Sequence, residues 1–130
     1  MLTNSFGGNA LRLKLHDAQD RVTELNAAAA RLARKTAATA TVMQRRPLLV
    51  AGSMGPTGEL FEPMGALTHA ATRDVFAAQA NALAKGGVDM LWIETMSSTE
   101  EIAAALEAAK ATGLMVAATM TFDTAARLMM

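Results

Sequence analysis

Cysteine is absent from the 130 residues of the chain, which excludes a disulfide and any thiolate metal ligand from this chain. Aromatic residues are scarce, at 4%, and tyrosine does not occur. Neither charge is in excess, because 12 basic residues balance 12 acidic ones. Proteins that bind nucleic acid through its phosphates present a surplus of basic residues, so we expect no nucleic-acid partner.

Long apolar runs are missing as well. No segment reaches the roughly 18 apolar residues of a membrane-spanning helix, and the first residues lack the pattern of a secretory signal. We therefore expect a cytoplasmic chain without a membrane partner. Hydrophobic residues nevertheless make up 52% of the chain, with a mean hydropathy of +0.21. Because this length is enough to bury a core, we expect a single domain over residues 1–130.

Apolar and helical patterns alternate along the chain. Apolar segments typical of buried strands lie at residues 1–5, 47–53, 88–94 and 114–121, and helical patterns lie between them at residues 17–39, 68–85 and 98–111. The order β-α-β-α-β-α-β predicts an α/β fold with a parallel sheet and right-handed crossovers. The content matches about half of a TIM (β/α)8 barrel, which typically takes about 250 residues. Residues 122–130 are predicted to begin a further unit.

Each helical segment carries a start signal. Asp17 is expected to cap the first helix and Thr68 the second, and a capping box from Ser97 to Glu100 is expected to begin the third. The residues expected to turn toward the core are Val22, Leu25, Ala29, Leu32, Phe76, Ala80, Leu83, Ile102, Leu106 and Ala109.

The strongest candidate for a functional residue is Glu94, at the carboxyl end of the strand predicted at residues 88–94. Ligands of α/β proteins bind at the carboxyl ends of the strands. Asn4, Ser53 and Thr119 hold similar positions in the other predicted strands, so we expect the four side chains to converge on a small amino acid. The alternative is a structural carboxylate that caps the next helix or is paired inside a barrel.

Two other features carry weaker signals. The glycine-rich residues 52–58 do not form a phosphate loop, because Pro56 lacks an NH and no lysine leads into a helix. We expect a rigid loop at the rim of a pocket instead. The only histidines, His16 and His69, have no neighbour at the spacing of metal ligands, so we expect surface or capping roles for both.

Four motifs together resemble a known family. Residues 3–9, 51–59, 92–96 and 119–123 read TNSFGGN, AGSMGPTGE, WIETM and TMTFD. In this order and spacing they resemble the homocysteine S-methyltransferase family, in particular its betaine–homocysteine and methionine-synthase-type members. The resemblance covers nearly the whole chain and corresponds to about strands two to five of the family's barrel.

The resemblance implies a (β/α)8 barrel that transfers a methyl group from a donor to the homocysteine thiolate and gives methionine. It also implies zinc as the activator of the sulfur, and a role for Glu94 in holding the homocysteine amino group. The methyl donor stays open among betaine, a methylated folate, a corrinoid and a sulfonium compound.

The chain departs from the family in its metal ligands. Zinc is held there by cysteines of later strands, and this chain has none. We therefore expect no zinc ligands here and a truncated chain that is inactive alone. Two alternatives stay open. One is a non-catalytic half-barrel that self-associates through its open sheet edges, and the other is an open flavodoxin-like domain that binds a small ligand. A switch point in the strand order would favour the flavodoxin-like fold.

Overall fold

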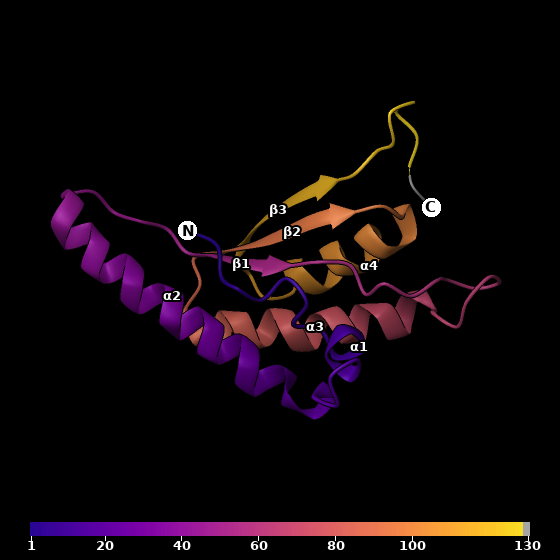
Figure 1. Ribbon diagram of the computed structural model, residues 1–130, viewed down its shortest axis with the longest axis horizontal. Coiled ribbons are helices and arrows are strands. Elements are labelled where there is room, and N and C mark those ends of the chain that lie inside the picture. The colour runs from indigo at the N-terminus through magenta and orange to yellow at the C-terminus, as the bar shows by residue number, and fades with distance from the viewer. Residues whose placement is uncertain (129–130) are drawn as a thin grey trace.

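The computed structural model describes residues 1–128 of the chain, which form an α/β arrangement (Figure 1). The elements are α1 (Ala10–Lys14), a 3-10 turn η1 (Gln19–Arg21), α2 (Val22–Gln44), β1 (Ala51–Met54), α3 (His69–Gly86), β2 (Met90–Met96), α4 (Thr99–Lys110) and β3 (Met115–Met120). The three strands pair in parallel in the order β1-β2-β3. No helix among these residues is both long and apolar enough to cross a membrane.

The amino-terminal segment takes a further place beside β1. Leu2 forms an isolated parallel bridge with Ala51, and the Ala51 NH donates to the Met1 carbonyl at 2.8 Å. The spatial order therefore follows the sequence from the amino-terminal segment to β3. An open flavodoxin-like sheet has a switch point in its strand order, and this sheet has none within residues 1–128. The fold is a partial, barrel-like α/β fold, as the sequence predicts.

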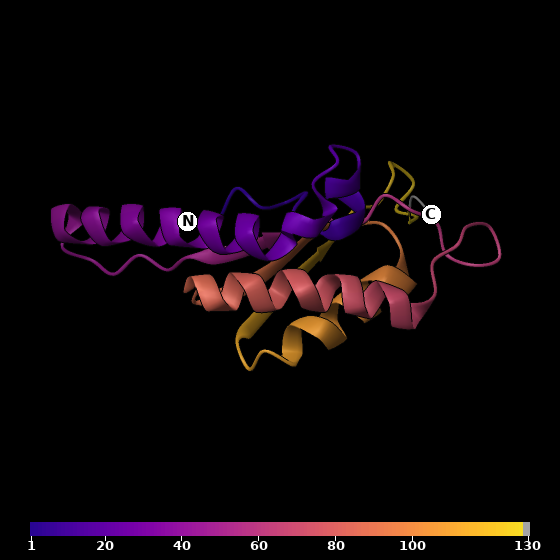
Figure 2. The same cartoon turned by 90° about the horizontal axis from the view of Figure 1, so that it is seen from below.

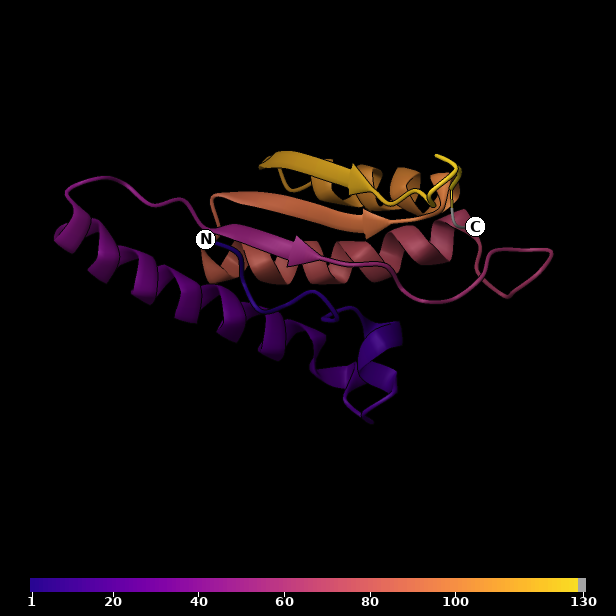
Figure 3. The same ribbon diagram turned by 45° about the horizontal axis from the view of Figure 1, so that its top comes forward.

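The helices lie on one face of the sheet. Figures 2 and 3 show α2, α3 and α4 on the same side, and no helix within residues 1–128 covers the opposite side. Burial along β2 follows this division, because Leu91 and Ile93 are buried toward the helices while Trp92 and Glu94 are only partly buried. The residues at the carboxyl end of the sheet therefore include side chains that reach the open face.

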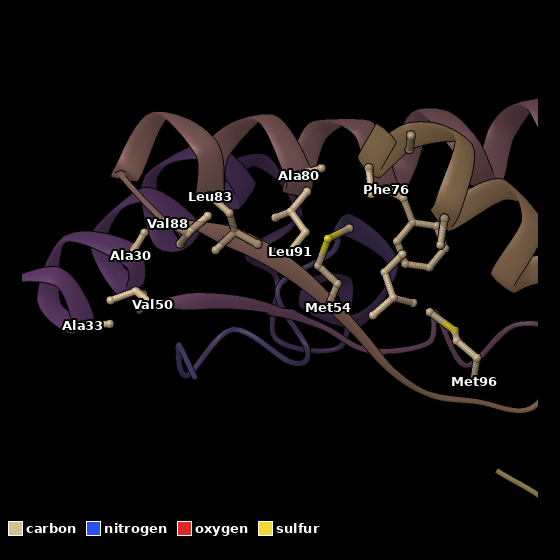
Figure 4. Close-up of a cluster of buried hydrophobic side chains, with 14 of the residues drawn as sticks. Ala30, Ala33, Val50, Met54, Phe76, Ala80, Leu83, Val88, Leu91 and Met96 are labelled. Carbon is tan, nitrogen blue, oxygen red and sulfur yellow. The ribbon is translucent and has the colours of Figure 1, made fainter. Parts of the chain in front are cut away.

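The core lies between the sheet and its helices (Figure 4). Phe76 and Leu83 of α3 and Leu91 of β2 belong to this core, and all three are fully buried. The helices α2 and α4 contribute mainly alanines to this core. Small side chains let the helices approach closely, and a Cβ atom on Gly86 of α3 would collide with the Ala30 methyl group. The scarcity of aromatic residues is consistent with this close packing.

Helix α2 corrects two predictions. It begins at Val22 rather than at Asp17, which instead adopts a left-handed conformation with φ of 53° after α1. Its buried face is also different from the predicted one. Val22 is buried as predicted, whereas Leu32 is 60% exposed. The other buried residues of α2 are Asn26, Ala27, Ala30, Ala33 and Ala37. Because α2 packs closely against α3, the small residues of α2 face α3. The large side chain of Leu32 lies on the outer side of α2.

The other elements match the predictions more closely. Thr68 caps α3 as predicted, and its hydroxyl oxygen accepts from the Ala71 NH at 3.2 Å. Helix α4 is capped by Ser98 rather than by Ser97, the first residue of the predicted capping box. The edge strand β3 contains no fully buried residue, although the sequence pattern indicates burial. The segment at residues 122–128 forms a tight turn closed by a bridge between Phe122 and Leu128, and residues 129–130 lie outside the described part of the chain.

Candidate functional site

A β-bulge shapes the carboxyl end of β2. Ile93 pairs with Ala118 and Met96 pairs with Met120, so β2 holds one residue more than β3 between these pairs. Thr95 lies in this bulge with a φ of 64°, and its NH donates to the Thr119 hydroxyl at 3.2 Å. Positive φ is rare for a β-branched residue and is concentrated at functional sites. The bulge sets the direction of the strand directly after Glu94.

Glu94 is held by the neighbouring strand. The Ser53 hydroxyl of β1 donates a hydrogen bond to Glu94 Oε1. Glu94 is half-buried, and within residues 1–128 its carboxylate makes no salt bridge and no other hydrogen bond. One carboxylate oxygen is therefore fixed by the protein, and the other has capacity for a donor from outside the described residues.

Ser53 is itself fixed by the amino-terminal segment. Its NH donates to Thr3 Oγ1 at 2.9 Å, and its carbonyl accepts from Ser5 Oγ at 2.8 Å. The two hydroxyl oxygens of Thr3 and Ser5 lie 2.6 Å apart. Ser53 is only 2% exposed, and Thr3 and Ser5 are buried as well. This network gives the Ser53 hydroxyl a defined position against Glu94.

The structure brings together three of the four residues expected at the site. Ser53 contacts Glu94 directly, and Thr119 meets the backbone of Thr95 on the adjacent strand. Asn4 is exposed and borders a hollow of about 480 Å³ that the amino-terminal segment forms with the outer side of α2. No hydrogen bond within residues 1–128 joins the Asn4 side chain to Glu94.

The loop between β1 and α3 lies beside this end of the sheet and is anchored on two sides. On one side, the Gly55 NH donates to the Phe6 carbonyl at 2.9 Å. On the other, the NH and the hydroxyl of Thr57 both donate to Glu101 Oε1, at 2.7 and 2.6 Å. The first turn of this loop is therefore held in place, in agreement with the rigid rim loop expected from its prolines and glycines. Its Thr57 NH is already used and is not available to a phosphate.

The described residues do not fit the zinc site of the family. No group of three or more His, Cys, Asp or Glu residues within residues 1–128 is arranged to hold a metal ion. His69 lies at the surface, where its Nε2 atom is 2.9 Å from a carboxylate oxygen of Glu107. This contact is the largest of the effects that lower the pKa of Glu107.

The sequential parallel sheet with helices on one face defines the class of this protein as a partial, barrel-like α/β protein. Such proteins bind small ligands at the carboxyl ends of their strands. The Glu94 carboxylate lies at this end of the sheet, on the face without helices. The chain belongs to the homocysteine S-methyltransferase family, whose family model matches residues 1–130. This confirms the family that the four sequence motifs indicate.

Curated relatives agree with this family. The chain is 31% identical over 104 residues to the methionine synthase of Mycobacterium tuberculosis (strain ATCC 25618 / H37Rv), an alignment that covers 80% of the chain and 9% of the relative. It is 30% identical over 104 residues to the methionine synthase of Mycobacterium leprae (strain TN), which covers 80% of the chain and 8% of the relative. The chain thus spans less than a tenth of either protein.

Sequence reasoning missed several residues that shape the site. Thr3 and Ser5 flank Asn4 in the amino-terminal segment. Because side chains alternate along a strand, the predicted strand indicates that Thr3 and Ser5 lie on the face opposite Asn4. The sequence contains no pattern that predicts the conformation of Thr95, because this conformation depends on how β2 pairs with β3. Glu101 was assigned no role, because its contact with Thr57 joins residues 44 positions apart.

Proposed function

We propose that this chain takes part in methyl transfer to homocysteine and provides the edge of the site that binds the amino-acid end of the substrate. The observation that carries the proposal is the Glu94 carboxylate, which lies near the carboxyl end of β2 on the open face and has one oxygen fixed by Ser53. Family membership supports homocysteine as the substrate. The names of the two mycobacterial relatives supply methionine as the product.

In this proposal Glu94 accepts hydrogen bonds from the ammonium group of homocysteine. Ser53 holds Oε1, so that Oε2 is presented to the ligand in one orientation. Thr119 shapes the neighbouring strand end through its bond to the Thr95 NH. A charge-assisted contact of this kind contributes roughly 1.5–3 kcal/mol to binding. Asn4 borders a separate hollow and is not needed for this contact.

The reaction itself needs groups beyond the described residues. The homocysteine sulfur attacks the methyl carbon, so that an S–C bond forms, the bond from the methyl group to its donor breaks, and the thiol proton is lost. A thiolate is the competent nucleophile. The chain has no cysteine, and residues 1–128 hold no metal-binding group. We therefore propose that this chain binds substrate but does not complete methyl transfer alone.

A direct test compares homocysteine with an analogue that lacks the amino group, using amide NMR signals of the full chain. Homocysteine is expected to shift the signals of Ser53, Glu94 and Thr119 in a saturable way, and the deaminated analogue is expected to leave them in place. Equal shifts with both compounds would contradict an ammonium contact. A methyl-transfer assay on the same sample, with a panel of methyl donors, is expected to show no turnover.

A second candidate function is self-association of a half-barrel, and it rests on the exposed edge of the sheet. Within β3 no residue is fully buried, and Met115 is 71% exposed. The sheet also carries a hollow of about 300 Å³ over the amino-terminal segment, β1 and β2, lined by Met1, Leu2, Leu49, Ala51, Met90 and Trp92. Unpaired strand edges and apolar faces favour pairing with another chain.

A further inference from the structure

Glu101 is a buried carboxylate that the family assignment does not explain. It lies in the first turn of α4 and is only 1% exposed. Its Oε1 atom accepts both hydrogen bonds from Thr57, whereas Oε2 is buried without a hydrogen-bond partner within the described residues. Burying a carboxylate with one oxygen unpaired costs free energy, although a helix N-terminus offsets part of the cost.

The helix does not need this carboxylate for its cap. The Ser98 hydroxyl already accepts from the Glu101 NH at 3.3 Å, and Glu100 supplies an exposed acidic group in the same turn. The Glu101 side chain turns instead toward the loop between β1 and α3. Its contribution is therefore to hold Thr57, which is itself 2% exposed.

Holding Thr57 also constrains Ser53, four residues earlier in the chain. The intervening segment is attached to the amino-terminal segment through Gly55 and is closed by Thr57 on the side of α4. These two anchors fix the chain directly after β1, at whose end Ser53 lies within hydrogen-bond distance of Glu94. Residues that fix the orientation of a binding group from behind commonly decide how well it binds.

We propose that Glu101 is a positioning residue for the amino-acid site, because its carboxylate holds Thr57 and keeps Ser53 against Glu94. This inference rests on the proposed function, in which Glu94 binds the homocysteine ammonium group. It assigns Glu101 no contact with the substrate. Its effect on binding passes through the loop, so loop mobility and homocysteine affinity change together.

The test measures homocysteine affinity and the amide hydrogen exchange of Thr57 for the full chain and its variants. In Glu101→Ala we expect faster exchange at Thr57 and a dissociation constant about tenfold higher, the loss that follows from releasing a charge-assisted anchor. In Glu101→Gln the amide oxygen can still accept both bonds from Thr57, so we expect affinity within about threefold of the parent. Glu107→Gln, an exposed position on the same helix, is the matched control and is expected to change neither quantity.

A second variant covers the case in which Glu101→Ala does not fold. Thr57→Val removes one of the two bonds to Glu101 and keeps the shape of the side chain, and we expect it to weaken homocysteine binding a few-fold. Parent-like affinity in folded Glu101→Ala, or in Thr57→Val if the former does not fold, would overturn the positioning role. A merely structural Glu101 would lower the melting temperature without changing affinity in the folded protein. If Glu94→Gln also binds like the parent, the proposed function has failed; if only Glu94→Gln weakens binding, the positioning role alone has failed.

Discussion

Thr95 combines a side chain that disfavours positive φ with a φ of 64°, one residue after Glu94. For an L-residue this left-handed conformation costs roughly 1–2 kcal/mol. The bulge keeps Thr95 there because the strand pairs on both sides of it are formed and its NH reaches Thr119. Strained residues of this kind are concentrated at functional sites. The strain at Thr95 therefore agrees with a role in orienting Glu94, the proposed binding residue, at some cost in stability.

Replacing Thr95 with glycine is expected to relieve this strain. Glycine adopts positive φ without steric cost but adds freedom to the unfolded chain, so we expect Thr95→Gly to raise the free energy of unfolding by about 1 kcal/mol or less. Urea denaturation measures the change. Thr99→Gly, in the helical first turn of α4, is the control and is expected to lower stability. A loss of stability in Thr95→Gly as large as in the control would contradict a strained Thr95.

Asp89 makes a pH-dependent contribution at the opposite end of the sheet. Burial raises the pKa of Asp89, but the Val50 NH and the Arg34 guanidinium, each 2.7 Å from Oδ2, together outweigh burial and lower the pKa. Because the pKa is lower in the folded protein, the contribution is present above the unfolded value of about 3.9 and is lost as pH falls through the folded pKa.

The expected result is a pH-dependent difference between the parent and Asp89→Asn. We expect the two unfolding free energies, measured by urea denaturation at a series of pH values, to differ most near neutral pH. The difference should shrink as the medium is acidified below about pH 4. A difference that stays constant down to pH 2 would show that the ionised form of Asp89 adds nothing to stability.

The contact between α2 and α3 depends on small side chains at the level of whole elements. The buried face of α2 is mostly alanine, and Gly86 at the end of α3 lies directly against Ala30. Gly86→Ala places a methyl group in this contact and is expected to cost about 1–3 kcal/mol by pushing the helices apart. Lys85→Ala, at the exposed neighbouring position, should cost much less. Thermal unfolding compares the two variants, and equal melting temperatures would contradict the close approach.

How far the sequence predicts each element depends on whether local or distant contacts decide it. Thr68 and the face of Phe76 and Leu83 were predicted correctly, because capping and helical periodicity are local. The buried face of α2 was predicted only in part, because hydrophobicity favours Leu32 while packing against α3 favours small residues. Cap positions such as Ser98 differ by one residue, a shift that adjacent serines make hard to resolve.

At the candidate site the same distinction separates what was predicted from what was missed. The placement of Glu94 at a strand end follows from a local pattern, and its meeting with Ser53 follows from parallel neighbouring strands. The bulge at Thr95 depends on pairing with β3, and the link from Thr57 to Glu101 depends on the path of a loop. Neither leaves a signal in a single sequence, because both come from contacts between distant segments.

The molecule as a whole leaves one sheet face and the β3 edge without cover within residues 1–128. With 12 basic and 12 acidic residues, little net repulsion opposes association. We expect the full chain to self-associate at micromolar concentration, as measured by sedimentation velocity. Met115→Lys places a charge on the exposed edge and is expected to shift the distribution toward monomer. A monomer at every concentration would contradict the prediction and remove the second candidate function.

The central claim is that Glu94 binds the ammonium group of homocysteine, and calorimetric titration of Glu94→Gln tests it most directly. Gln keeps an oxygen for the Ser53 hydroxyl, so the fold is expected to stay intact. Loss of the charge should remove roughly 1.5–3 kcal/mol, which raises the dissociation constant about tenfold to a hundredfold. Glu59→Gln, at an exposed position in the loop after β1, should bind as the parent does. Unchanged homocysteine affinity in Glu94→Gln, together with a large fall in melting temperature, would show instead that Glu94 is a structural carboxylate.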